Sequence, residues 1–262
     1  MKTIVITGGS SGIGAALARH LGEQGHNLAL AARHAERLNS VAANVRSHVT
    51  TVVTDVTRRE DVVRLRDEAL RAFGTIDVWI NNAGRGIARP ALELTDAEFD
   101  EMMAVNVKSA LYGMQVVAPH FIERRQGHII NISSFLGRVP IATHRSAYNA
   151  AKAALNSLTA NVRVDLAMQY PGIHVSLVMP GLVATEFARN AIGSTGNAPP
   201  PWVANSPMKP QSAEEVAAAI ASVIEHPVAE MYTNPASAPM AQRYFEDVST
   251  FEEGLLTDRA RA

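Results

Sequence analysis

Residues 4–21 of the chain read IVITGGSSGIGAALARHL, which is a β-branched apolar run, a glycine-rich turn and a helical pattern in direct succession. The run Ile4–Thr7 is short and apolar, as expected for a buried strand. Gly8, Gly12 and Gly14 would let the backbone turn tightly, and the start of the following helix offers free N–H groups and a positive dipole end. This order predicts a pyrophosphate site, with an ordinary Gly/Ser turn as the alternative, since the spacing differs from G-x-G-x-x-G.

Strand and helix patterns keep alternating beyond this unit. Further strands are expected at Asn27–Ala32, Val49–Thr54, Asp77–Ile80, Ile129–Ile132, Ile173–Met179 and within Val228–Thr233. Helical patterns are expected at 15–21, from Arg33 through Arg46, at 58–73, from Thr95 or Asp96 through Ala104, at 105–119, around Tyr148 to about Tyr170, at 212–226, and weakly near Ala241–Val248. The alternation predicts an α/β fold: one Rossmann-type, doubly wound parallel sheet of about seven strands, with helices on both faces. Ligands then bind at the carboxyl ends of the strands.

Composition narrows the possible functions. The 262 residues are 47% apolar, so the chain 1–262 is expected to form a single domain. A net charge of −1 gives no basic footprint for nucleic acid or an anionic membrane, and no apolar run is long enough for a membrane span. The absence of cysteine excludes disulfides and thiolate chemistry, and it fits a cytoplasmic protein.

One acidic cluster could be mistaken for a metal site. Its members are Glu93, Asp96, Glu98, Asp100 and Glu101. Acidic residues favour the first turns of a helix, so we interpret the cluster as a solvated helix start and expect no metal.

Tyr148 and Lys152 stand four residues apart in SAYNAAKAAL, residues 146–155, a run with good helix formers and no Pro or Gly. On a helix this spacing puts both side chains on one face, about 5–6 Å apart at Cβ. A phenol has a reference pKa of about 10, and an ammonium about 4 Å away at an effective dielectric of about 20 favours the phenolate by about 4 kcal/mol. We therefore expect Lys152 to lower the pKa of Tyr148 into the range useful for general acid–base catalysis, unless the two form only a surface pair.

Together these motifs resemble the classical short-chain dehydrogenase/reductase family, from Thr3 to about Thr185. TGGSSGIG at 7–14 is similar to the family's T-G-x-x-x-G-x-G, NNAG at 81–84 to its N-N-A-G, and PGLVAT at 180–185 to its P-G-x-V-x-T. The family's catalytic tetrad would fall on Asn106, Ser134, Tyr148 and Lys152. Ser133 competes with Ser134, and the similarity favours Ser134.

The resemblance implies the roles of these four residues. Tyr148 would pass a proton to or from the substrate oxygen, and Ser134 would hold that oxygen by a hydrogen bond. Lys152 would lower the pKa of Tyr148 and bind the nicotinamide ribose. Asn106 would interrupt its helix and support a water-mediated proton relay. Taken singly, Asn106 could also be a helix cap and Ser134 a strand-end turn.

Arg33 bears on the choice of cofactor. In this family an acidic residue at the end of the second strand binds the adenosine ribose of NAD, whereas here Ala32 is followed by Arg33. A guanidinium can hold a 2′-phosphate through two hydrogen bonds, so NADP is favoured over NAD, with a solvated strand end as the other interpretation. Asp55 and Val56 would bracket the adenine, unless Asp55 forms an Asx turn. The expected cofactor-binding residues are Gly8, Ser10, Ser11, Gly12, Ile13, Gly14, Arg33, Asp55, Val56, Asn82, Ala83, Gly84, Tyr148, Lys152, Pro180, Gly181, Val183 and Thr185.

The expected function is an NADP(H)-dependent oxidoreductase that interconverts a carbonyl and a secondary alcohol, with Ser134 and Tyr148 contacting the substrate. The alternatives are an NAD-dependent alcohol dehydrogenase of the same family, a non-catalytic NADP-binding sensor, and an epimerase or dehydratase of the extended branch. A substrate lid is expected at 185–210, because the chain there becomes rich in Pro, Asn, Ser and Gly. The resemblance also implies a homodimer or homotetramer. Candidate pocket residues are Phe135, Leu136, Arg138, His144, Leu182, Phe187 and Trp202.

Overall fold

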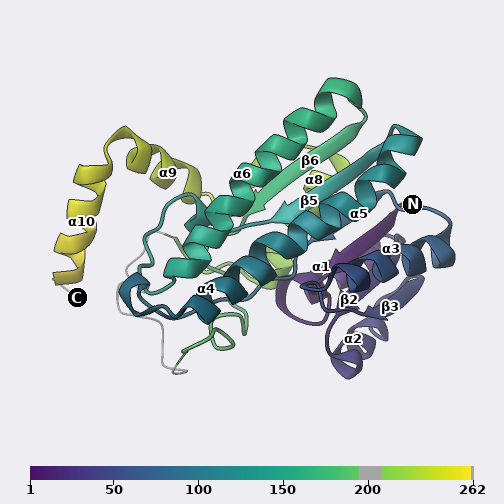
Figure 1. Ribbon diagram of the computed structural model, residues 1–262, viewed down its shortest axis with the longest axis horizontal. Helices are drawn as coiled ribbons and strands as arrows, with labels where there is room; N and C mark the ends of the chain where they lie inside the picture. The colour runs from purple at the N-terminus through teal and green to yellow at the C-terminus, as the bar shows by residue number, and fades with distance from the viewer. Residues whose placement is uncertain (195–207, 261–262) are drawn as a thin grey trace.

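The computed structural model describes residues 1–194 and 208–260, and these form a seven-stranded parallel sheet between layers of helices (Figure 1). The strand order is β3-β2-β1-β4-β5-β6-β7. The strands are β1 (Thr3–Thr7), β2 (Asn27–Ala32), β3 (Val49–Val53), β4 (Val78–Asn81), β5 (Gly127–Ile132), β6 (Ile173–Met179) and β7 (Glu230–Tyr232). The predicted fold class is confirmed.

Helices cover both faces of the sheet, because its central strands are apolar on both sides. On one face, Leu17 of α1 and Ile220 of α8 pack on the sheet, joined by Leu38 of α2. On the other face, the sheet is covered by Leu65 of α3, Phe121 of α5 and Leu166 of α6. The helices are α1 (Gly12–Glu23), α2 (Ala35–Ala42), α3 (Arg59–Phe73), α4 (Asp96–Met103), α5 (Ser109–Arg124), α6 (Ser146–Gln169), α8 (Ala213–Glu225), α9 (Ser237–Glu246) and α10 (Val248–Ala260).

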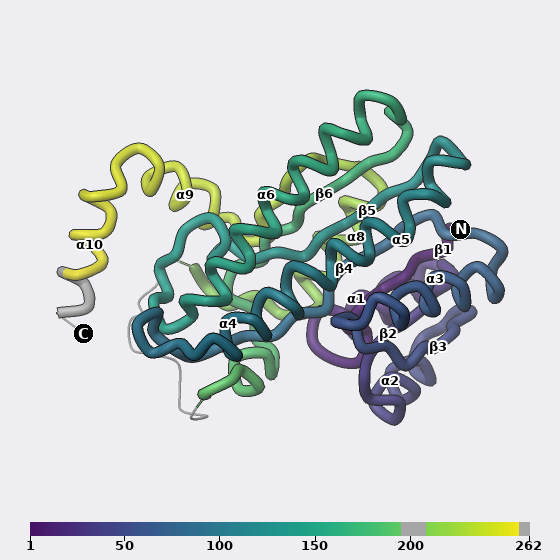
Figure 2. Tube along the Cα trace, in the orientation of Figure 1, coloured from purple at the N-terminus to yellow at the C-terminus, as the bar shows by residue number. Residues whose placement is uncertain are grey.

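Strand β1 marks the point at which the order of the sheet reverses. It pairs with β2 on one side and with β4 on the other. The loops that leave β1 and β4 therefore diverge over opposite parts of the sheet, and such a switch point is where open α/β sheets bind ligands. Figure 2 shows these strands side by side along the Cα trace.

Two helices end at residues other than those that the helical pattern predicts, because tertiary packing sets their ends. The pattern extends to Arg46, but α2 ends at Ala42. The chain turns there so that Val45 can pack on Gly22, where an added Cβ would lie 2.3 Å from Val45 Cγ1. The pattern also predicts an end at Pro119, but α5 continues to Arg124 because Phe121 is fully buried in the core.

The tail differs from the single weak helix expected near Ala241–Val248. It forms α9 and α10, with the break at Asp247. Asp247 Oδ1 accepts a 3.0 Å hydrogen bond from the Thr250 amide, and Oδ2 accepts one of 2.7 Å from the Thr250 hydroxyl, so its carboxylate caps the new helix. Figure 1 shows α10, in yellow, extending away from the sheet. Within the described ranges, no helix combines the length and apolarity needed to cross a membrane.

Candidate active site

A cavity of about 780 Å³ opens at the carboxyl ends of the strands. It is lined by the loops after β1, β2, β3, β4, β5 and β6, together with the first turns of α6. Of the predicted catalytic and cofactor-binding residues, all line this cavity except Gly14 and Asn106, which lie directly behind its wall. The structure thus brings together segments that are up to about 180 residues apart in the chain.

The glycine loop is built for close approach of backbones. Gly8 has a φ of +70°, and a Cβ there would lie 2.9 Å from Ala83 Cα. A Cβ on Gly14 would lie 2.2 Å from the Gly8 carbonyl oxygen. Thr7 Oγ1 accepts hydrogen bonds from the amides of Asn82 (3.0 Å) and Ala83 (3.1 Å), which ties the loop to the N-N-A-G segment. A side-chain-free surface at the start of α1 fits the diphosphate of a dinucleotide.

The end of β2 is basic. Arg33, His34 and Arg37 all line the cavity and are exposed. Among the described residues, none of the three forms an ion pair. Sequence reasoning found Arg33 but missed His34 and Arg37, although Arg37 lies one helical turn beyond Arg33. Three basic side chains at this position fit a dinucleotide that carries an additional phosphate.

Asp55 forms the Asx turn that the sequence left open as an alternative. Its Oδ1 accepts from the Thr57 amide at 2.9 Å and from the Thr57 hydroxyl at 2.7 Å. The Asp55 amide in turn donates to Asp61 Oδ2 at 2.9 Å. Asp55 and Val56 still line the cavity, so the turn presents them to a ligand.

Ser134 and Ser133 have different surroundings. Ser133 donates a 2.5 Å hydrogen bond to Asn156 Oδ1, which commits its hydroxyl to packing against α6. Ser134 lies two residues beyond the end of β5 in an extended conformation, accepts a 3.2 Å hydrogen bond from the Leu136 amide and lines the cavity together with Tyr148. This geometry favours Ser134 as the serine of the site.

Lys152 and Tyr148 are both buried, at 3% and 7% exposure. Lys152 Nζ donates a 2.9 Å hydrogen bond to the Ile132 carbonyl oxygen and lies 5.7 Å from the centre of the Tyr148 ring. Burial lowers the pKa of Lys152 to about 7. Burial also raises the pKa of Tyr148, against the opposing effects of the Ser134 hydrogen bond and the Arg145 charge.

The expectation that Lys152 lowers the pKa of Tyr148 is therefore corrected. The positive charge that acts on the phenol in this structure is that of Arg145, at the N-cap of α6. The reason is that desolvation weakens the charge of Lys152 and raises the pKa of the phenol together. Helical spacing predicted the pair, but it contained no information about its burial.

Asn106 lies in a π-helical turn, Ala104–Lys108, between α4 and α5. The turn interrupts the helix, as expected. Asn106 Oδ1 accepts from the Arg85 amide at 3.2 Å, and Nδ2 donates to the Arg85 carbonyl at 2.9 Å. A Cβ on Gly84 would lie 2.9 Å from Asn106 Oδ1 and 3.6 Å from Lys152 Nζ, so Asn106 and Lys152 lie on either side of Gly84.

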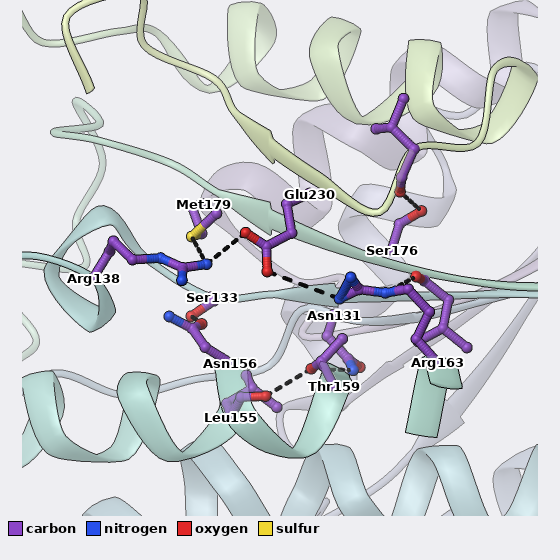
Figure 3. Close-up of polar contacts among 12 residues, drawn as sticks. Asn131, Ser133, Arg138, Leu155, Asn156, Thr159, Arg163, Ser176, Met179 and Glu230 are labelled. Carbon is purple, nitrogen blue, oxygen red and sulfur yellow. Dashed lines mark hydrogen bonds and ion pairs between the residues drawn. The ribbon is translucent and has the colours of Figure 1, made fainter. Parts of the chain in front are cut away.

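Buried polar contacts hold α6 against β5. Asn131 Nδ2 donates to Thr159 Oγ1 at 2.9 Å, and Thr159 donates to the Leu155 carbonyl at 2.7 Å. Figure 3 shows these contacts beside the Ser133–Asn156 pair, with Glu230 of β7 between two arginines above them. The contacts fix the helix that carries Tyr148 and Lys152 relative to the strand that ends before Ser134.

The substrate side of the cavity contains three of the seven candidate pocket residues. Leu136, Leu182 and Phe187 line it, and the Phe187 and Tyr148 ring centres lie 5.5 Å apart.

Three other candidates do not line this cavity. Phe135 is buried in a separate apolar cluster with Met208 and Met240. Arg138 forms an ion pair with Glu230 at 2.5 Å. His144 does not line the cavity, and its carbonyl accepts from the Arg89 amide. These residues are close to the site in sequence but turn away from it. Trp202 lies outside the described residues.

The acidic residues of the α4 region are used as the sequence suggested. Thr95 and Glu98 form a capping box at the start of α4. Glu98 also pairs with Arg89, and Glu101 with Arg85. Among the described residues no group of three or more potential metal ligands is present.

The family model for short chain dehydrogenases matches residues 2–194, so the chain belongs to the short-chain dehydrogenase/reductase family and is an oxidoreductase. An uncharacterized oxidoreductase of Staphylococcus epidermidis is 34% identical over 186 residues, which make up 71% of this chain and 80% of that protein. A short-chain dehydrogenase/reductase from Burkholderia phymatum, solved in complex with NAD, aligns with a TM-score of 0.84 at 28% identity, over 95% of this chain and 94% of that one. A short chain dehydrogenase from Burkholderia cenocepacia J2315, in complex with NADP, aligns with a TM-score of 0.79 at 29% identity over 97% of each chain.

Proposed function

We propose that this oxidoreductase interconverts a carbonyl compound and a secondary alcohol, with NADP(H) as hydride carrier and Tyr148 as the group that exchanges the proton. The observation that supports this most directly is the single cavity shared by Ser134, Tyr148, Lys152, the glycine loop and the basic end of β2. When bound, the nicotinamide supplies hydride in reduction or accepts it in oxidation. The protein supplies position, proton transfer and electrostatics.

Each part of the cavity wall is suited to one part of the nucleotide. The glycine loop would bind the diphosphate, and Arg33 with Arg37 would bind the 2′-phosphate. Asp55 and Val56 would flank the adenine, and Lys152 would bind the nicotinamide ribose. The remaining contacts would come from Ser10, Ser11, Ile13, Asn82, Ala83, Gly84, Pro180, Gly181, Val183 and Thr185.

The protonated form of Tyr148 is the form that carbonyl reduction requires. Because burial raises the pKa of Tyr148, the phenol keeps its proton at neutral pH and can give it to a carbonyl oxygen. Ser134, which lines the cavity together with Tyr148, would hold that oxygen. Lys152 and Asn106, behind Gly84, would return a proton to Tyr148 through water.

We also propose that 185–210 forms a lid over the substrate. Of its described part, Thr185, Glu186, Phe187, Ala188 and Asn190 line the cavity. Ile192 forms a parallel bridge with Ile87, which holds this part beside the loop after β4. Residues 195–207 of the expected lid lie outside the described residues.

The proposal is tested by titrating the protein with NADPH and NADH and then following nicotinamide absorbance with a panel of ketones and aldehydes. We expect turnover with NADPH. Tyr148→Phe should abolish turnover while nucleotide affinity stays within about threefold, because only the proton donor is lost. Undiminished turnover in Tyr148→Phe would remove the general-acid assignment. Tight nucleotide binding without turnover of any carbonyl would instead identify the sensor protein.

A further inference from the structure

Three arginines lie around the loop after β4 and the start of α6, and two of them are neutralised by α4. Arg85 forms an ion pair with Glu101, and Arg89 pairs with Glu98 at 3.1 Å. The third, Arg145, forms no ion pair with any of the described residues. Arg145 therefore differs from Arg85 and Arg89 in that no described carboxylate balances its charge.

Arg145 lines the catalytic cavity and carries a buried, unpartnered nitrogen. Its Nη1 is inaccessible to solvent and has no hydrogen-bond partner among the described residues. A Cβ on Gly86 would lie 3.0 Å from this nitrogen and 3.0 Å from Phe187 Cε1. The guanidinium is thus held between the loop after β4 and the aromatic ring that packs on Tyr148.

Among the described side chains, no carboxylate lies within ion-pair distance of Arg145, and Glu186, which lines the same cavity, is exposed. Residues 195–207 contain no Asp or Glu, so this segment cannot supply a carboxylate. The positions suited to the cofactor phosphates are at the glycine loop and the end of β2, whereas Arg145 is three residues before Tyr148. A buried guanidinium nitrogen without a partner is costly, and the planar fork to which it belongs matches a carboxylate or a phosphate.

We propose that Arg145 binds an anionic group of the substrate, so that the enzyme acts on carbonyl compounds bearing a carboxylate or phosphate and not on neutral ketones. This inference rests on the proposed function. Arg145 and Tyr148 line the same cavity and Phe187 lies beside both, so the two side chains can contact one small molecule. A substrate whose anion meets Arg145 while its carbonyl oxygen meets Tyr148 has the two groups only a few bonds apart. Leu136 and Phe187 would contact the apolar part of such a molecule.

The test compares charged and neutral forms of the same carbonyl compound. Acetoacetate is paired with methyl acetoacetate, and dihydroxyacetone phosphate with dihydroxyacetone, each with NADPH and with NADH. In the wild type we expect kcat/KM at least tenfold higher for one charged compound than for its neutral partner, and the better pair distinguishes carboxylate from phosphate. Arg145→Met should lower that value about 10- to 100-fold while leaving the neutral compound within threefold, and Arg145→Lys should be intermediate. Arg243→Met, which removes an exposed charge of the same kind on α9, away from the cavity lining and the proposed lid, is the matched control and should change neither value.

A binding measurement separates this inference from the proposed function. Acetoacetate and dihydroxyacetone phosphate are titrated calorimetrically onto the wild type and Arg145→Met in the presence of NADP⁺, and the loss of anion binding in the variant supports the inference even without turnover. Equal losses for charged and neutral compounds, or equal anion binding by both proteins, would overturn the role of Arg145 and leave the oxidoreductase assignment intact. Absence of turnover for charged and neutral compounds alike, with anion binding dependent on Arg145, would count against the proposed function alone.

Discussion

The Nζ atom of Lys152 donates a 2.9 Å hydrogen bond to the carbonyl oxygen of Ile132, the last residue of β5. The contact draws the end of the lysine side chain into the sheet edge, where it is 3% exposed. Burial there lowers the pKa of Lys152 from 10.5 to about 7. The lysine is therefore close to half-protonated at neutral pH, and small changes in its surroundings alter its charge.

The stability of the protein should depend on pH through Lys152. Between about pH 7 and pH 10 the unfolded state holds a proton that the folded state has lost, so the free energy of unfolding rises with pH. In this window the free energy of unfolding of the wild type should rise by up to about 1.4 kcal/mol per pH unit relative to that of Lys152→Met. Urea unfolding at several pH values measures the difference. Lys209→Met, at an exposed position, should give a line parallel to the wild type, and a parallel line for Lys152→Met would refute the burial effect.

Nucleotide preference should depend on the basic end of β2. Arg33→Ala and Arg37→Ala should each weaken NADPH binding about tenfold or more and change NADH binding less than threefold, because only NADPH carries the 2′-phosphate. Fluorescence titration with both nucleotides measures this. Arg46→Ala, an exposed charge outside the cavity lining, is the control. Equal losses for NADPH and NADH would mean that neither arginine contacts the phosphate.

Gly14→Ala should disrupt the start of α1. The new Cβ would lie 2.2 Å from the Gly8 carbonyl oxygen and 2.7 Å from Asn82 Nδ2, so the loop must shift. We expect a loss of about 2 kcal/mol or more in the free energy of unfolding, together with loss of nucleotide binding. In Gly254→Ala of α10 the added Cβ meets nothing within 4 Å, and this variant should be neutral or slightly stabilised. If Gly14→Ala had the same melting temperature as the wild type, the glycine loop would not be packed against α1 as described.

Asn106→Ala should loosen the loop after β4. Its side chain satisfies both the amide and the carbonyl of Arg85, and each buried backbone group left unpaired costs about 1–3 kcal/mol. We expect a fall in kcat larger than the change in nucleotide affinity, and faster hydrogen exchange at the Arg85 amide. The Ala88 amide, which donates to the Ile192 carbonyl at 2.7 Å, is the internal reference. Unchanged exchange at Arg85 would contradict the bridging role.

Periodicity and glycine spacing were sufficient to predict the fold, because the apolar strands are buried on both faces and their turns are marked in the sequence. The strand β5 and the helix α6 are examples: β5 was expected to begin two residues from its observed start, and α6 to end one residue from its observed end. The residues at which helices end were harder to predict. The end of α2 depends on the packing of Val45 against Gly22. The continuation of α5 beyond Pro119 depends on the burial of Phe121. Neither contact is local in the sequence.

Motifs likewise predicted the residues of the site better than their electrostatic state. Tyr148 and Lys152 come together because they share a helix face, yet the direction of the Tyr148 pKa shift depends on desolvation and on Arg145. Arg145, His34 and Arg37 were missed because nothing in their sequence context distinguishes them from solvated charges. Phe135 and Arg138 were misplaced for the opposite reason, since closeness to Ser134 in the chain does not determine which way a side chain turns.

The position of β1 between β2 and β4 divides the chain into two portions with separate duties. The cavity wall near Arg33 and Asp55 is built entirely before Phe73, and the wall near Tyr148 entirely after Ile80. From the proposed function we therefore expect a chimera joined within the intervening turn to take its nucleotide preference from one parent and its choice of carbonyl compound from the other.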